Sequence, residues 1–124
     1  MSNINTRETM QVTRSLALSS EPSGGLICIR GRQLGHMISL PADRIMTFGR
    51  DPAECNIVLN DSLVSRLHCQ ITYIAAMEKY RIVDFSKNGT FLGDGTRLQS
   101  GKEYYVKSAT EIYLGNSDNL YKLR

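Results

Sequence analysis

The feature that most constrains the fold is a series of short apolar runs that begins around Leu26. The runs are GLICI, HMISL, RIMTF, NIVL, CQITYI, KYRIVDF, GTFL, EYYV, EIYL and NLYKL. Several alternate with a period of two, and β-branched and aromatic residues are common in them, as is typical of strands. Turn-forming segments such as GRQLG, LNDS, SKNG and GDG separate them. The pattern predicts an all-β fold, an antiparallel β-sandwich of about ten or eleven short strands.

The first 24 residues differ from the rest of the chain. They carry many Ser and Thr residues, end in SSEPSGG and show no sustained periodicity. This composition predicts a flexible N-terminal arm over residues 1–24, followed by one folded domain over residues 25–124. The N-terminus lacks the apolar core of a signal peptide, and no stretch approaches the ~18 apolar residues of a membrane span. We therefore expect a soluble chain that does not bind membranes.

Charge and cysteine usage narrow the function further. The net charge is +3, with 15 Lys and Arg residues distributed among 12 acidic residues, so we expect no long nucleic-acid-binding surface. The odd set Cys28, Cys55 and Cys69 lacks metal-ligand spacing and lies among apolar residues, which favours reduced thiols in the cytoplasm. His36 and His68 are the only histidines, so the sequence predicts no metal site and no cofactor.

The stretch DSLVSRLHCQITY, residues 61–73, first suggests catalysis. Ser65 and His68 could form half of a nucleophile pair, with Asp61 or Asp84 as a third member. However, the chain has no G-x-S-x-G elbow on a strand-to-helix turn, and a Ser and a His three positions apart at the start of a strand more often support a loop. Cys69 would point to the opposite face of the strand from His68. We therefore predict no catalytic residues.

Anion binding fits the polar residues better. Three segments at strand ends supply guanidinium, ammonium, hydroxyl and amide donors: Arg50, Ser65, Arg66, Lys87 and Asn88. Loops at one end of a sandwich can bring such donors together, and a phosphoryl group needs several of them because it carries about −1.5 to −2 charges at neutral pH. Each part alone also has an ordinary explanation. Asn88 and Gly89 could form a hairpin turn, Ser65 could cap a turn, and the cations could be solvated.

The segments FGRDPAECNIVL, VSRLHCQI, IVDFSKNGTFLGDGTRL and GKEYYVKSATEIYLG occur in this order over residues 26–124. In order and spacing they resemble the forkhead-associated (FHA) domain family, whose members are β-sandwiches that recognise phosphothreonine in peptides. The resemblance implies a phosphothreonine-dependent interaction module in Ser/Thr-kinase signalling, without catalysis, whose partner is a phosphothreonine-containing protein or peptide. The alternative is an FHA-like, phosphate-independent docking or structural domain, although such domains often lose the residues found here as Arg50, Ser65 and Asn88.

The resemblance also implies residue roles. Phosphopeptide binding is expected from Arg50, Ser65, Arg66, Lys87 and Asn88. Structural support of the site is expected from Gly49, His68 and Gly89. The loop that helps to select the peptide residue three positions after the phosphothreonine would be Gly93, Asp94 and Gly95, where many relatives have Asn-Gly. We expect Asp94 to disfavour an acidic residue at that position.

The N-terminal arm suggests a second ligand for the same site. Its threonines Thr6, Thr9 and Thr13 lie near Arg7 and Arg14. Phosphorylation there would create a ligand within the chain, which could bind in cis at high effective concentration or in trans to give oligomers. The alternative is an unmodified, solvated tail.

Overall fold

The computed structural model describes residues 23–124. They form ten strands and, within this range, no helix. The strands are β1 (Ser23–Arg30), β2 (Met37–Pro41), β3 (Met46–Gly49), β4 (Ile57–Val58), β5 (Cys69–Ile74), β6 (Lys79–Asp84), β7 (Thr90–Leu92), β8 (Glu103–Lys107), β9 (Glu111–Leu114) and β10 (Leu120–Leu123). The strands coincide with the apolar runs of the sequence, because alternating residues can bury one face of a strand and solvate the other.

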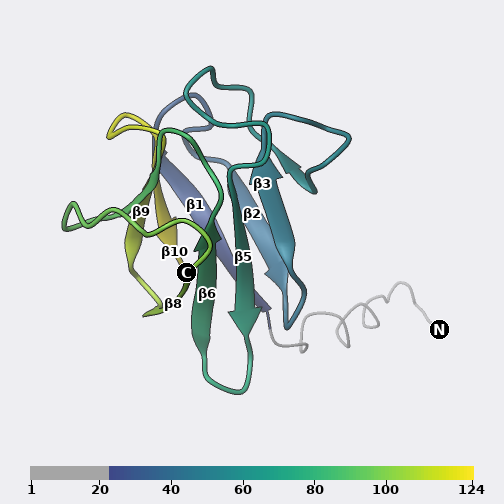
Figure 1. The fold of residues 1–124 in the computed structure, drawn as a ribbon. Helices are drawn as coiled ribbons and strands as arrows, with labels where there is room; N and C mark the ends of the chain where they lie inside the picture. Colours follow the sequence, from purple (N-terminus) through teal and green to yellow (C-terminus); the bar gives the residue numbers. More distant parts are fainter. Residues whose placement is uncertain (1–22) are drawn as a thin grey trace.

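Two five-stranded sheets pack face to face (Figure 1). Their strand orders are β2-β1-β10-β9-β7 and β4-β3-β5-β6-β8. The all-β sandwich is therefore confirmed. One pairing departs from the antiparallel expectation: β4 runs parallel to β3, with Phe48 opposite Ile57. The chain leaves Gly49, loops outward and returns beside the end of β3, where the Leu59 N–H donates to the Gly49 carbonyl at 2.8 Å.

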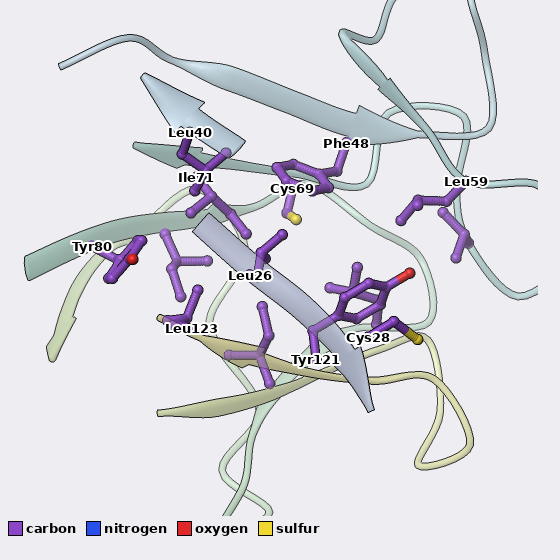
Figure 2. Packing of buried hydrophobic residues seen from close by; sticks show 14 of the residues in the cluster. Leu26, Cys28, Leu40, Phe48, Leu59, Cys69, Ile71, Tyr80, Tyr121 and Leu123 are labelled. Carbon is purple, nitrogen blue, oxygen red and sulfur yellow. The ribbon is translucent and has the colours of Figure 1, made fainter. Parts of the chain in front are cut away.

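The core lies between the two sheets and takes side chains from both. Figure 2 shows Leu26 and Tyr121 of one sheet packed with Phe48, Cys69 and Ile71 of the other. The buried hydrophobic cluster comprises Leu26, Cys28, Leu40, Phe48, Leu59, Val64, Cys69, Ile71, Tyr80, Ile82, Leu98, Ile112, Leu114, Tyr121 and Leu123. Burial raises the pKa of the Cys69 thiol well above its usual range. This thiol therefore packs as a small apolar side chain.

The glycine pair that resembled a flexible linker belongs to β1. Gly24 pairs with Leu40 in the sheet, and a Cβ atom on Gly24 would lie 2.7 Å from both the Tyr73 ring and the Tyr80 hydroxyl. The Gly25 N–H donates to that hydroxyl at 3.0 Å. The structure thus places residues 23 and 24 in the first strand and not in the arm predicted for residues 1–24, and the close packing on tyrosine requires glycine at position 24. The threonines Thr6, Thr9 and Thr13 lie outside the described residues.

The antiparallel pairing brings three loops to the same end of the sandwich. Since β5 pairs with β3 and with β6 in antiparallel register, it begins where both of these strands end. The loops over residues 50–56, 59–68 and 85–89 therefore meet there. Figure 1 shows the chain between β3 and β5 at the top and the β5–β6 turn at the opposite end. Residues 23–124 contain no helix that is long and apolar enough to cross a membrane.

Candidate functional site

The main chains of the first two loops are joined by hydrogen bonds. The Arg50 N–H donates to the Ser65 carbonyl at 3.0 Å, and the Asp51 N–H donates to the Arg66 carbonyl at 3.2 Å. This approach requires glycine before Arg50, because a Cβ atom on Gly49 would lie 2.0 Å from the Arg66 carbonyl oxygen. The GR pair of the sequence therefore places an arginine directly against the second loop.

Arg50 is exposed, and its guanidinium is oriented by the second loop. Its Nε donates to the carbonyl oxygen of Val64. This bond leaves both terminal NH₂ groups to donate to a ligand, which is the fork that binds a phosphate or carboxylate through two parallel hydrogen bonds. Arg50 lines an open hollow of about 490 Å³, the Arg50 hollow, whose other lining residues are Arg32, Asn60, Asp61 and Ser62.

Ser65 links the second loop to the third. Its Oγ accepts a hydrogen bond from the Lys87 N–H at 2.9 Å. Because the hydroxyl acts as an acceptor in this bond, its own hydrogen can be donated to an anion. Lys87 and Arg66 are both exposed, in loops that meet at this end of the molecule.

His68 is fully buried beneath these loops, with 0% exposure. Its Nδ1 accepts the Ser65 N–H at 3.0 Å, so its Nε2 carries the hydrogen and donates to the Gly89 carbonyl at 2.9 Å. Burial lowers the pKa of His68, although the hydrogen bond to Gly89 opposes this effect. Both ring nitrogens therefore bond to main-chain groups, and the Ser65 hydroxyl does not pair with the imidazole as it would in a nucleophile pair.

The third loop carries Asn88 toward the second. The Asn88 Nδ2 donates to the Leu63 carbonyl at 3.0 Å, which leaves its Oδ1 to accept an N–H from a ligand. The next residue, Gly89, has a φ of 101°, a conformation that favours glycine. The NG pair does not form a hairpin turn, because β6 and β7 belong to different sheets. It lies in a bend of the chain that presents the asparagine amide.

Asp84 organises the same loop, a role that the sequence interpretation missed. It is 1% exposed, and its Oδ1 accepts the Ser86 hydroxyl at 2.6 Å, the Ser86 N–H at 3.2 Å and the Thr90 hydroxyl at 2.8 Å. The Ser86 Oγ in turn accepts the Gly89 N–H at 2.8 Å. The signal was available in the sequence, because an Asp followed two residues later by a Ser often forms such a side-chain turn.

Comparison with known proteins identifies the family. The FHA domain model matches residues 46–115, which is 70 of the 124 residues. The chain belongs to the FHA domain family. It is 27% identical over 104 residues to the human "Nuclear inhibitor of protein phosphatase 1", covering 83% of this chain and 29% of that protein. It is 33% identical over 87 residues to the "Probable serine/threonine-protein kinase fhkA" of Dictyostelium discoideum, covering 64% of this chain and 14% of that protein. The chain therefore spans less than a third of these relatives.

Solved FHA domains share the fold. The FHA domain of CT664 from Chlamydia trachomatis has a TM-score of 0.70 and 25% identity, covering 82% of this chain and 96% of that one. The N-terminal FHA domain of Rad53p from S. cerevisiae, solved in complex with a phosphothreonine peptide, has a TM-score of 0.65 and 26% identity. That match covers 82% of this chain and 90% of the Rad53p domain. The resemblance seen in the sequence is thereby confirmed, and FHA domains are binding modules.

Two further arginines of this FHA domain lie at the same end and were not among the predicted site residues. Arg97 donates from Nη2 to the Lys87 carbonyl at 3.0 Å, and its guanidinium lies over the Phe91 ring, 5.6 Å from the centroid. Arg32, in the β1–β2 loop, donates from Nη1 to the Asn60 carbonyl at 2.9 Å. Both are joined to the site through main-chain carbonyls distant in sequence, so no local motif marks them.

None of the residues of the GDG turn lines the Arg50 hollow. Asp94 is exposed, and its carboxylate accepts the Thr96 N–H at 2.9 Å, which lowers the pKa of this carboxyl. Gly95 lines a separate, mostly apolar hollow of about 240 Å³ together with Phe91 and Tyr113. Gly93 lies against Glu111, where a Cβ atom would approach the Glu111 Cβ to 3.2 Å. The role predicted for this turn in peptide selection stays a prediction.

Proposed function

We propose that this FHA domain is a phosphothreonine-dependent interaction module that binds phosphorylated proteins or peptides in Ser/Thr-kinase signalling. One observation carries the proposal. His68 hydrogen-bonds to two loops, and these loops, with the one after β3, present the Arg50 guanidinium, the Ser65 hydroxyl and the Asn88 amide at one end of the sandwich. Membership of a family in which the Rad53p domain was solved with a phosphothreonine peptide supports the same reading.

The donors suit a dianionic phosphate. Arg50 supplies two terminal NH₂ groups and Ser65 supplies a hydroxyl hydrogen, while Arg66 and Lys87 add positive charge nearby. Because Nε of Arg50 and Oγ of Ser65 already bond to the protein, these groups lose less conformational freedom when they bind a ligand. Asn88 would accept a main-chain N–H of the peptide through Oδ1, which fixes the peptide without reading its side chains.

The test is a titration monitored by backbone amide chemical shifts. Three degenerate peptide pools are compared: phosphothreonine, matched phosphoserine and unphosphorylated threonine. The proposal expects shifts confined to the loops around Arg50, Ser65 and Asn88, and only with the phosphothreonine pool. If all three pools leave the spectrum unchanged, the phosphate-independent docking module replaces this proposal. Shifts of equal size with the phosphoserine pool would refute selectivity for threonine.

Two finer parts of the proposal concern the peptide. Asp94 is exposed, and the Thr96 N–H lowers its pKa and keeps it charged, so it should disfavour an acidic residue three positions after the phosphothreonine. A peptide screen in which Asp is preferred there would contradict this.

The N-terminal arm could supply a ligand through phosphorylated Thr6, Thr9 or Thr13. Phosphorylating the arm should then change self-association or weaken binding of an added peptide, and no change in either would remove the idea.

The compartment is also part of the proposal. Cys28, Cys55 and Cys69 are all free thiols in the structure, which fits a reducing compartment such as the cytoplasm. The human relative is named as a nuclear inhibitor, and the nucleus is equally reducing. Imaging of a tagged full chain distinguishes the two locations, and a secreted chain would contradict both.

A further inference from the structure

The Arg50 hollow extends away from the residues expected to bind phosphothreonine. It is lined by Arg32, Arg50, Asn60, Asp61 and Ser62. Ser65 and Lys87, which bond to each other through the Ser65 hydroxyl, are not part of this lining. Its volume of about 490 Å³ falls in the range of roughly 300–1,000 Å³ that holds drug-sized ligands. The hollow therefore has room for more of a peptide than one phosphoryl group.

The second arginine of the hollow is held in place. Arg32 comes from the β1–β2 loop, and its Nη1 donates to the Asn60 carbonyl at 2.9 Å, a contact across 28 positions of sequence. The remaining N–H groups of the guanidinium can donate to a ligand. Arg32 and Arg50 thus each use one donor on a main-chain carbonyl and keep the others for an anion.

The charge of the lining is positive. The lining contains two guanidiniums and one carboxylate, that of Asp61, and Asp61 Oδ1 accepts the Leu63 N–H at 2.9 Å. A phosphate bound by Arg50 and Ser65 would compensate Arg50 but not Arg32. Since electrostatic complementarity sets specificity more than overall affinity, Arg32 should act by choosing among phosphopeptides.

We propose that Arg32 is a specificity-determining residue of this FHA domain. It binds a second anionic side chain of the same phosphopeptide, either an Asp or Glu carboxylate or a second phosphate, while the phosphothreonine occupies the Arg50–Ser65 site. The planar guanidinium fork matches both anions. This inference rests on the proposed phosphothreonine binding.

The experiment measures affinities for phosphothreonine peptides in which each of about four positions on either side of the phosphothreonine is, in turn, Ala, Asp or phosphoserine. The proteins are the wild type, Arg32→Ala and the control Arg44→Ala, an exposed arginine in the β2–β3 connection at the opposite end. In the wild type, an anion at one position should raise affinity about tenfold over Ala. Arg32→Ala should abolish this gain and leave affinity for the all-Ala peptide within about twofold, whereas Arg44→Ala should retain the gain.

A charge reversal separates a direct contact from a structural effect. In Arg32→Glu, the preference at the same position should invert, so that Lys binds better than Asp. The inference is overturned if the wild type shows no anion preference at any position, or if Arg32→Ala keeps it. If the wild type binds none of the phosphopeptides, the proposed function and this inference are both overturned. If only the inference about Arg32 is wrong, the wild type still binds the all-Ala phosphopeptide, so the two outcomes are distinguishable. Comparing Asp with phosphoserine shows which anion the site takes.

Discussion

Replacing His68 by Phe should separate the stability of the site from its chemistry. The substitution keeps a buried ring of similar size but removes both hydrogen bonds of the imidazole. The Ser65 N–H then has no acceptor, because its hydrogen bond is to His68 Nδ1. The Gly89 carbonyl loses the imidazole but keeps the Gly115 N–H at 2.9 Å. The substitution therefore leaves the Ser65 N–H without a partner, whereas the Gly89 carbonyl keeps one.

The magnitude follows from these two losses. An unsatisfied main-chain N–H in a partly buried place costs about 1–3 kcal/mol, and loss of one hydrogen bond at an acceptor that keeps another costs about 1 kcal/mol. The free energy of unfolding should thus fall by about 2–4 kcal/mol. For a domain of about this size each kcal/mol shifts Tm by roughly 4–8 °C, so Tm should fall on the order of 10–30 °C.

Thermal and urea unfolding measure this loss, with His36→Phe as the matched control. His36 is exposed, so its replacement should change stability by less than about 0.5 kcal/mol. At temperatures where His68→Phe remains folded, phosphopeptide affinity should also fall, because the Ser65 loop is no longer joined to the Gly89 turn. A His68→Phe variant that melts within about 4 °C of the wild type would refute the role of His68 in joining the loops.

The pH dependence of stability tests the same residue. Burial lowers the pKa of His68. The imidazole therefore stays neutral in the folded domain at a pH where, in the unfolded chain, it already binds a proton, because its ordinary pKa is about 6.5. The contribution of His68 is therefore present above that pH and is lost as pH falls through the lowered pKa. The wild type should lose stability below about pH 6.5 more steeply than His68→Phe, and parallel pH profiles would contradict this account.

Three other outcomes are expected. Arg50→Ala should weaken phosphopeptide binding by about 2–5 kcal/mol in calorimetry, and Arg50→Lys should restore little of it because an ammonium lacks the fork; Arg44→Ala should leave affinity unchanged, and an unchanged affinity in Arg50→Ala would remove Arg50 from the site. Gly49→Ala should lower stability by about 1–3 kcal/mol or more in urea unfolding, because its Cβ would meet the Arg66 carbonyl at 2.0 Å; wild-type stability would mean that the two loops separate easily. Phosphopeptide affinity should rise from pH 5 to 7.5 as the phosphate gains its second charge near pH ~6, and a flat profile would exclude recognition of the dianion.

The strands could be predicted from the sequence because their signal is local. A period of two places every other residue in the core, as Cys69 and Ile71 show in β5. The exceptions have a physical cause. Gly24 and Gly25 resembled a linker, since glycine is common in flexible segments. Here Gly24 leaves room for Tyr73 and Tyr80, and Gly25 leaves room for the Ile38 carbonyl oxygen. Composition cannot distinguish a glycine that gives flexibility from one that gives room.

The contacts that join the loops could not be predicted in the same way. His68 to Gly89 spans 21 positions, Arg97 to Lys87 spans 10, and each is a bond between a side chain and a main-chain group. Main-chain groups are the same at every residue, so the sequence shows the donor but not its partner. Ser65, Arg50 and Asn88 could be proposed because they belong to motifs, whereas Arg32 and Arg97 depend on how loops approach one another after the sheets form.

The buried and the exposed residues of the site differ in how freely they can be substituted. The buried groups that join the loops, His68 and Asp84, bond to neighbours within the domain, and altering them affects folding as well as binding. The exposed arginines that line the Arg50 hollow, Arg32 and Arg50, bond to main-chain carbonyl oxygens. Replacing Arg32 should cost little stability, because surface substitutions rarely change the free energy of unfolding by more than about 0.5 kcal/mol. Peptide specificity can therefore be changed at Arg32 while phosphate binding by Arg50 and Ser65 is preserved. For the same reason, Arg32→Ala and Arg32→Glu should fold like the wild type, and any change they make in peptide preference reports on the contact itself.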